Sequence, residues 1–353
     1  MKLEIKVVKR VLIHIGVFMQ KIIIFGASGN VGSYLTHYAK KFFDEKYEVI
    51  ASGRRSTTVF QSEGVDYVSV DITKKEDFEK LPQSCVKAVF LLSSATPSYM
   101  ANYNPENYLR TNVLGTFNVL EYCRKVGCER FIFTQTTYDI WLYDHDTVLK
   151  ADLPPKFPYT GDHAVYTISK NSAIELIKHY HAEYGLKYYI FRPGTVYCWS
   201  DYQYYFPGGE KKMRPLYVMI NRALNGEDIE LWGNPEYKKD MLYVYDFAQE
   251  MCKAVITNKV DHGIYNGGTG KPVSMKEQIQ TIIDVFSPAN KKSKIIYLPE
   301  KKSGGGILFD IENAREELGY EPVYDVRAMF EDMKKEMTLG RFKELRIETE
   351  AHN

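Results

Sequence analysis

The stretch Lys21-Ile22-Ile23-Ile24-Phe25-Gly26-Ala27-Ser28-Gly29-Asn30-Val31-Gly32 joins an apolar run to a glycine-rich turn and to the start of a helical pattern. Ile22 to Phe25 is typical of a buried strand, and Val31 to Phe43 is typical of a helix. Small residues between a strand and a helix permit a tight turn whose backbone N–H groups can approach a pyrophosphate closely. The sequence therefore predicts a dinucleotide site with the binding residues Gly26, Ser28, Gly29, Asn30, Val31 and Gly32.

Strand and helix patterns alternate downstream of this turn. Further apolar runs of strand length lie at 47–51, 66–70, 88–92, 131–133 and 188–191, with helical stretches between them, such as 107–126 and 171–184. This alternation is typical of a parallel sheet with helices on both faces. We therefore predict an α/β fold, namely a Rossmann doubly wound parallel sheet with a smaller C-terminal α/β substrate-binding lobe.

The change to an irregular pattern after Pro193 sets the predicted domain boundaries. The dinucleotide-binding domain is expected over 19–195, rejoined by about 240–265, and the substrate-binding lobe over 196–239 and 266–345, with a polar tail at 346–353. Residues 1–18 are set apart as a leader or a misassigned start, because Met19 directly precedes the first strong strand. An extra edge strand is the alternative for that segment.

The composition excludes several classes of partner. Lys and Arg total 46 and Asp and Glu total 45, so the formal net charge is +1, and no basic field exists to hold nucleic acid or an anionic membrane. The five cysteines are scattered and lack the spacing of a metal site. Reduced thiols, a cytoplasmic location and no bound metal are therefore expected.

Two arginines follow the second predicted strand, in Ala51-Ser52-Gly53-Arg54-Arg55-Ser56. An NAD-specific site has an acid here to bind the ribose diol, whereas arginine can meet a 2′-phosphate. Arg54 and Arg55 therefore favour NADP over NAD as the cofactor. Asp71 and Ile72, after the third strand, are placed to contact the adenine, and an ordinary helix-capping role is the alternative for Asp71.

Tyr166 and Lys170 form a Tyr-x-x-x-Lys pair within Ala164-Val165-Tyr166-Thr167-Ile168-Ser169-Lys170. Residues four apart share one face of a helix, so the Lys170 ammonium can sit beside the Tyr166 phenol and favour its phenolate. A phenol with an ordinary pKa near ~10 can then work as a base near neutral pH. Together with the glycine-rich turn, the pair indicates nicotinamide-dependent hydride chemistry.

Four further motifs follow in order: Thr111-Asn112-Val113-Leu114-Gly115-Thr116, Phe131-Ile132-Phe133-Thr134-Gln135-Thr136, Phe191-Arg192-Pro193-Gly194-Thr195-Val196-Tyr197 and Tyr243-Val244-Tyr245-Asp246. Their order and spacing resemble the extended short-chain dehydrogenase/reductases, the family of nucleotide-sugar epimerases and dehydratases. The likeness covers almost everything after Met19, and the later motifs are most similar to those of the UDP-glucose/UDP-galactose 4-epimerase-like enzymes.

The resemblance implies roles for three catalytic residues. Tyr166 would be the acid/base at a sugar hydroxyl or ketone, and Lys170 its electrostatic partner and a ligand of the nicotinamide ribose. Thr136 would replace the usual serine, because a threonine hydroxyl can also donate to the substrate oxygen. Thr134 and Thr137 are the alternative occupants of that position.

Four other residues are assigned roles by the resemblance. Asn112 is a fourth catalytic candidate, because it falls where the family keeps a buried asparagine near the active site, with a structural role in a helix bend as the alternative. Pro193 would border the cofactor. Lys239 replaces the arginine that often precedes the second-lobe aspartate, and either Lys239 or Arg214 would neutralise a substrate diphosphate. A solvated loop residue is the alternative for Arg214.

One departure from the family pattern bears on the reaction. The nucleotide-sugar 4,6-dehydratases place a carboxylate just after the catalytic Ser/Thr, because elimination of water needs an additional acid and base. Here Thr136 is followed by Thr137 and Tyr138, and Asp139 comes one step late. Dehydration is therefore disfavoured unless Asp139 swings in.

The sequence predicts an NAD(P)-dependent nucleotide-sugar epimerase of the 4-epimerase type, an oxidoreductase-like enzyme of carbohydrate metabolism. The alternative is an NADPH-dependent nucleotide-4-keto-sugar reductase, which the two arginines favour; both reactions begin with hydride transfer beside Tyr166. From another class, a non-catalytic NADP-binding regulator would need no Tyr/Lys pair. The resemblance also implies a homodimer formed through helices 107–126 and 171–184.

Overall fold

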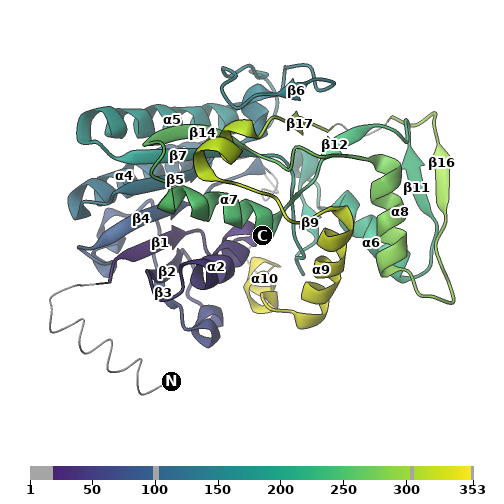
Figure 1. The fold of residues 1–353 in the computed structure, drawn as a ribbon, viewed down its shortest axis with the longest axis horizontal. Coiled ribbons are helices and arrows are strands. Elements are labelled where there is room, and N and C mark those ends of the chain that lie inside the picture. The colour runs from purple at the N-terminus through teal and green to yellow at the C-terminus, as the bar shows by residue number, and fades with distance from the viewer. Residues whose placement is uncertain (1–18, 98–102, 303–305, 351–353) are drawn as a thin grey trace.

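The computed structural model describes residues 19–97, 103–302 and 306–350. The predicted leader, residues 1–18, lies outside the described residues. Figure 1 shows a large unit of sheet and helices on one side and a smaller lobe on the other. None of the helices in the described ranges combines the length and the apolar character that a membrane span requires.

The large unit is built on a seven-stranded sheet with the strand order β14-β7-β5-β4-β1-β2-β3. Every adjacent pair of these strands is parallel. The predicted doubly wound sheet is therefore confirmed, and its strand order reverses between β1 and β4. The strands are β1 Lys21–Phe25, β2 Glu48–Gly53, β3 Asp66–Ser69, β4 Val86–Leu91, β5 Arg130–Thr134, β7 Lys187–Pro193 and β14 His262–Gly267.

Helices cover both faces of this sheet (Figure 1). Successive residues of a strand point to opposite faces, so Ile24 joins the core under α2 and α7, while Ile23 joins the core under α4 and α5. Burial on both faces explains why β1 is a continuous apolar run. The four helices are α2 Asn30–Phe43, α7 Val244–Ile256, α4 Gly115–Val126 and α5 Ala164–Tyr184.

The predicted helix 107–126 has a change of helical type near its start. A short helix, α3 (Pro105–Tyr108), runs into a π-helical segment, η4 (Leu109–Leu114), before α4 begins. Asn112 lies in this segment, and its carbonyl accepts a hydrogen bond from the Thr116 hydroxyl at 2.7 Å. Segments of this kind are rare and often mark functional positions.

The glycine-rich turn between β1 and α2 depends on two glycines. Gly26 has φ 86°, and a Cβ there would lie 2.6 Å from the backbone nitrogen of Ser93. A Cβ on Gly32 would lie 2.0 Å from the carbonyl oxygen of Gly26. A side chain on Gly32 would push the first turn of α2 away from the end of β1, and one on Gly26 would clash with the segment after β4, because the obstructing atoms belong to the backbone.

The smaller lobe forms a second layered unit. The parallel pair β11 and β16 packs with α6 and α8, and α9 packs on α8. Its main elements are α6 Pro215–Leu224, β11 Ile229–Trp232, β12 Lys238–Asp240, β15 Pro272–Ser274, α8 Met275–Phe286, β16 Ile295–Leu298 and α9 Val326–Leu339. The short strands are β6 Val148–Leu149, β8 Val196–Tyr197, β9 Tyr204–Tyr205, β10 Lys212–Met213, β13 Leu242–Tyr243 and β17 Leu308–Phe309. Short 3₁₀ helices lie at η1 Val59–Glu63, η2 Lys75–Lys80, η5 Thr137–Ile140 and η6 Pro207–Gly209, and η7 Ala314–Leu318 is a second π-helical segment.

The C-terminal end of the chain differs from the sequence prediction. Arg346, the first residue of the predicted polar tail, lies in helix α10 (Lys343–Glu350) and is buried. Two buried apolar residues just before it, Phe342 and Leu345, hold this helix against the large unit. In Figure 1, α10 (yellow) accordingly lies beside α2 rather than extending into solvent.

Candidate active site

A groove of about 790 Å³ runs along the edge of the sheet where the strands end. Its walls come from the turn after β1, from the residues that follow β2 and β3, and from the segment after β4. Ligands of doubly wound folds bind at this edge, where the strand order reverses. The predicted cofactor residues that line it are Gly26, Ser28, Gly29, Asn30, Arg54, Arg55, Asp71 and Ile72.

Three other residues of the predicted cofactor set, Val31, Gly32 and Pro193, are not among the residues that line the groove. Val31 packs against the core, and Gly32 contacts the Gly26 carbonyl. Pro193 ends β7, in register with Gly267 of β14. These three residues therefore shape the site through the fold.

The turn after β1 fits the pyrophosphate of a dinucleotide. The Gly26 and Ala27 N–H groups donate to the Ser52 carbonyl at 2.8 and 2.9 Å, which fixes the turn to the end of β2. Gly29 precedes the first residue of α2, so the N-terminus of that helix opens beside the groove. Helix N-termini present N–H donors and a partial positive charge, and the missing Cβ atoms let an anion approach them.

The segments after β2 and β3 are held by local hydrogen bonds. The carbonyls of Arg54 and Arg55 accept from the hydroxyls of Ser69 and Tyr67, so both arginines are anchored at the groove. The Asp71 carboxylate accepts from the Thr73 N–H at 3.0 Å and from its hydroxyl at 2.8 Å. Asp71 therefore caps a turn, as in the alternative interpretation of the sequence, while it also lines the groove.

Thr136 and the Tyr166/Lys170 pair are brought together in the interior. Thr136 follows β5, and the other two residues lie on α5; all three are buried. Thr136 shares a hydrogen bond with Tyr166, and its hydroxyl oxygen also accepts from the Tyr138 N–H at 3.2 Å. Among the three candidate threonines, Thr136 is thus the one for which the structure shows a contact with Tyr166.

Burial dominates the electrostatics of this pair. It raises the pKa of Tyr166 to about 12, and the hydrogen bond from Thr136 opposes that shift. Burial also lowers the pKa of Lys170 to about 7. The Lys170 Nζ lies 4.0 Å from the centroid of the Phe133 ring, whose face attracts a cation. The expected lowering of the Tyr166 pKa is therefore not seen in the protein by itself, because burial disfavours the charged phenolate.

Asn112 holds the groove and helix α5 together. Its Oδ1 accepts from the Ser94 hydroxyl and the Ala95 N–H, both at 2.9 Å, and its Nδ2 donates to the Ala95 carbonyl and the Ser169 hydroxyl, both at 3.0 Å. These four bonds occupy both ends of the amide. Asn112 therefore joins the segment after β4 to helix α5.

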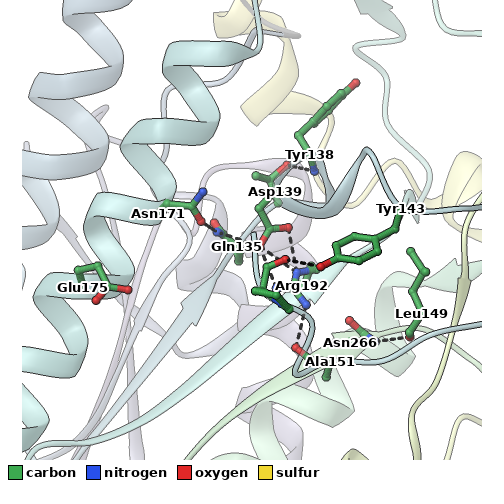
Figure 2. A network of polar contacts seen from close by, with 12 residues as sticks. Gln135, Tyr138, Asp139, Tyr143, Leu149, Ala151, Asn171, Glu175, Arg192 and Asn266 are labelled. Carbon is green, nitrogen blue, oxygen red and sulfur yellow. Dashed lines mark hydrogen bonds and ion pairs between the residues drawn. The ribbon is translucent and has the colours of Figure 1, made fainter. Parts of the chain in front are cut away.

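Asp139 is held by an ion pair with Arg192. Both Asp139 and Arg192 are buried, and the Arg192 fork donates three hydrogen bonds of 2.9 to 3.0 Å to the carboxylate. Arg192 also donates to the Ala151 carbonyl at 2.9 Å, and Gln135 donates to Asp139 at 3.4 Å (Figure 2). Burial raises the pKa of Asp139 while Arg192 opposes the shift. Moving Asp139 would leave a buried guanidinium unpaired, which is costly.

The two predicted substrate-diphosphate residues lie apart from the groove. Lys239 is in β12, with its Nζ 5.7 Å from the centroid of the Tyr197 ring. Arg214 directly precedes α6, with its guanidinium 5.7 Å from the centroid of the Tyr205 ring. Within the described part of the chain, no cluster of three or more His, Cys, Asp or Glu side chains is placed to hold a metal ion.

Two charged residues that line the groove, Arg110 and Arg346, are outside the predicted set of site residues. Arg346 lies more than 300 positions from the glycine-rich turn that it contacts. No local pattern marks such residues, because their proximity to the groove arises from contacts between distant parts of the chain.

The model of the NAD dependent epimerase/dehydratase family matches residues 22–268. The chain belongs to this family. It is thus an enzyme of the extended short-chain dehydrogenase/reductase type, as the ordered motifs predicted.

Individual members of the family show how far the similarity extends. A UDP-glucuronate 4-epimerase from Thermodesulfobacterium geofontis is 25% identical over 79% of this chain and 81% of its own length. The UDP-glucose 4-epimerase from Thermotoga maritima, solved with UDP-glucose, has a TM-score of 0.70 at 21% identity and covers 90% of this chain and 100% of that chain. The UDP-glucuronic acid 4-epimerase from Bacillus cereus, solved with NAD, has a TM-score of 0.69 at 21% identity, and the match covers 90% of this chain and 99% of that chain. The two structural matches confirm the fold.

The lowered pKa of Lys170 predicts an unusual pH dependence of stability. Unfolded lysine keeps its proton up to about pH 10.4, whereas folded Lys170, with a pKa of about 7, loses it earlier. Between these values unfolding takes up a proton, so the contribution of Lys170 to stability rises with pH and is lost as pH falls towards 7. We expect the free energy of unfolding of the wild type relative to Lys170→Met to increase by on the order of 3 kcal/mol between pH 6 and 9.5, measured by urea unfolding without nucleotide.

Lys178→Met is the matched control, because Lys178 lies on the same helix but is exposed and paired with Glu175. The difference between the wild type and this control variant should stay flat over the same pH range. Parallel pH profiles for the wild type and Lys170→Met would contradict the assigned burial of the ammonium.

Proposed function

We propose that this enzyme is an NAD(P)-dependent nucleotide-sugar epimerase of the 4-epimerase type. The observation that carries the proposal is that Asn112 joins the wall of the dinucleotide groove, at Ser94 and Ala95, to Ser169 on the helix that bears Tyr166. A cofactor in the groove and the Tyr166 hydroxyl would therefore belong to one site. The family match and the 4-epimerases among the relatives support this assignment.

The protein groups supply proton transfer and positioning. A bound nicotinamide dinucleotide would supply the hydride acceptor and donor. The Tyr166 oxygen would take the proton of the sugar carbinol during oxidation and return it during reduction, so that protons balance over the cycle. Thr136 would donate to the same sugar oxygen. A protonated Lys170 would favour the phenolate against the effect of burial, as would a cationic cofactor ring.

Dehydration is disfavoured by the ion pair that holds Asp139. Elimination of water needs an acid and a base beyond Tyr166, and the nearby carboxylate is fully engaged by Arg192. A 4-keto-sugar reductase remains the second candidate, because Arg54 and Arg55 line the groove where a 2′-phosphate would lie.

A panel of nucleotide sugars, including 4-keto forms, tests the proposed reaction. We expect interconversion of two sugars that differ at C4 with no net change in nicotinamide absorbance, measured with NAD and NADP by absorbance and product chromatography. Stoichiometric oxidation of NADPH with a 4-keto sugar would instead establish the reductase and refute the epimerase.

Substitution of Tyr166 tests the mechanism within the same assay. Tyr166→Phe should lower kcat by about 10²–10⁴-fold, because it removes the acid/base group, while dinucleotide affinity is retained. Tyr180→Phe is the matched control on the same helix, since its hydroxyl donates to Glu121 at 2.6 Å, far from the site. A Tyr166→Phe enzyme with the turnover of the control would show that another group moves the proton.

We further propose that the groove accepts NADP in preference to NAD. The support is the anchored pair Arg54 and Arg55, although the B. cereus relative was solved with NAD. The double variant Arg54→Ala/Arg55→Ala should raise the Kd for NADP by about 10-fold or more, because charge-assisted hydrogen bonds to the 2′-phosphate are lost. Its Kd for NAD should stay within about twofold of the wild-type value. Calorimetric titration of both cofactors decides this, with Arg124→Ala on α4 as a control. Equal Kd values for NADP and NAD in the wild type would refute the preference.

A homodimer is the proposed assembly. Three large apolar side chains are exposed on two neighbouring elements, namely Leu109 and Leu114 of η4 and Ile168 of α5. Exposed apolar side chains gathered in this way favour a contact with another protein chain. Light scattering should give about twice the chain mass of 40.9 kDa, and Leu114→Glu should shift the protein towards the monomer. A wild-type mass of one chain at micromolar concentration would refute the dimer.

The expected cytoplasmic location stays a prediction that cell fractionation can check.

A further inference from the structure

Helix α10 returns the C-terminal end of the chain to the dinucleotide-binding unit. Helix α9 ends at Gly340, whose φ of 57° turns the chain back. The ring of Phe342 then packs edge-on against Tyr34 of α2, with 5.0 Å between ring centroids, and Leu345 is buried. Arg341 pairs with Glu336 of α9 at 3.2 Å. Apolar packing and an ion pair thus set α10 at a defined place beside α2.

Arg346 extends from this helix to the glycine-rich turn. Its side chain is buried, with 5% exposed, and it lines the dinucleotide groove. Its Nη1 donates to the Ser28 carbonyl at 2.8 Å, and its Nη2 donates to the Gly29 carbonyl at 3.2 Å and to the Ser33 hydroxyl at 2.9 Å. The guanidinium is therefore held at the start of α2, where the groove meets the helix N-terminus.

The chemistry of this position suits a diphosphate. The three named acceptors are neutral oxygens, and they orient the guanidinium at the groove. The guanidinium charge adds to the partial positive charge of the α2 N-terminus at the same place. Arginine presents a planar fork of donors that matches phosphate oxygens, and a buried guanidinium is stabilised by an anion that it contacts.

We propose that Arg346 binds the pyrophosphate of the dinucleotide, so that the C-terminal helix α10 is part of the cofactor site. The proposal rests on the proposed function only in naming a nicotinamide dinucleotide as the ligand. It adds a cationic residue to a site that the glycine-rich turn would otherwise form through its backbone alone. It also couples the docking of α10 to cofactor binding, since a ligand that contacts the docked helix favours the docked state.

Ligands with and without phosphate test the proposal on the full-length protein. The ligands are NAD and ADP-ribose, which carry the pyrophosphate, and adenosine, which does not. Affinities are measured by calorimetry, or by NMR titration for adenosine. Arg346→Gln should weaken NAD and ADP-ribose by about 10-fold or more and change adenosine by less than twofold. Arg327→Gln is the matched control, an exposed arginine of α9 paired with Asp284 and Glu331, and it should leave all three affinities within twofold.

Two results would overturn the role of Arg346. One is unchanged affinity of Arg346→Gln for ADP-ribose. The other is an equal loss for adenosine and ADP-ribose, which would mean that Arg346 only holds the turn. If Arg346→Gln does not fold, Arg346→Lys, which keeps the charge but loses the fork, should show an intermediate loss for ADP-ribose, and unchanged affinity would again refute the proposal. A wild-type protein that binds neither dinucleotide would instead refute the proposed function itself.

Discussion

The rest of the site depends on the close contact between Gly32 and the carbonyl oxygen of Gly26. A Cβ on Gly32 would lie 2.0 Å from that oxygen, so only glycine lets the first turn of α2 approach the end of β1. This approach places a helix N-terminus at the point where the strand order reverses. It also turns the Ser28 and Gly29 carbonyls towards Arg346. One steric constraint thereby places a helix N-terminus and the carbonyls that Arg346 contacts beside the groove.

Two buried polar residues, Asn112 and Arg192, then fix backbone segments around the site. Asn112 spans from the segment after β4 to Ser169, and it lies in a π-helical segment that departs from regular α-helix. Arg192 holds Asp139 through three hydrogen bonds beside Thr136. Such groups are stable in the interior only when their hydrogen bonds are satisfied, so each fixes the geometry of several backbone segments at once. Arg192 also engages the Asp139 carboxylate, so that this group is not available as the additional acid or base that dehydration needs.

Burial gives the Tyr166/Lys170 pair its electrostatic character. A raised pKa for the phenol and a lowered pKa for the ammonium both favour the neutral forms. A site of this kind responds strongly to any charge placed beside it, because its dielectric screening is weak. The activation of Tyr166 is therefore expected to depend on the bound cofactor and on the protonation of Lys170 together, and the sequence spacing of four residues provides only the shared helix face.

The sequence by itself determined the features that repeat locally. The continuous apolar runs predicted the parallel strands, the glycine spacing predicted the turn at the groove, and the four-residue spacing put Tyr166 and Lys170 on one helix. Tertiary structure decided the rest: the partners of Asn112 and Asp139, the direction of the Tyr166 pKa shift and the burial of Arg346 in place of a polar tail. The physical reason is that the periods of strands and helices are properties of residues close in sequence. Desolvation and hydrogen bonding instead depend on atoms that folding brings together from distant parts of the chain.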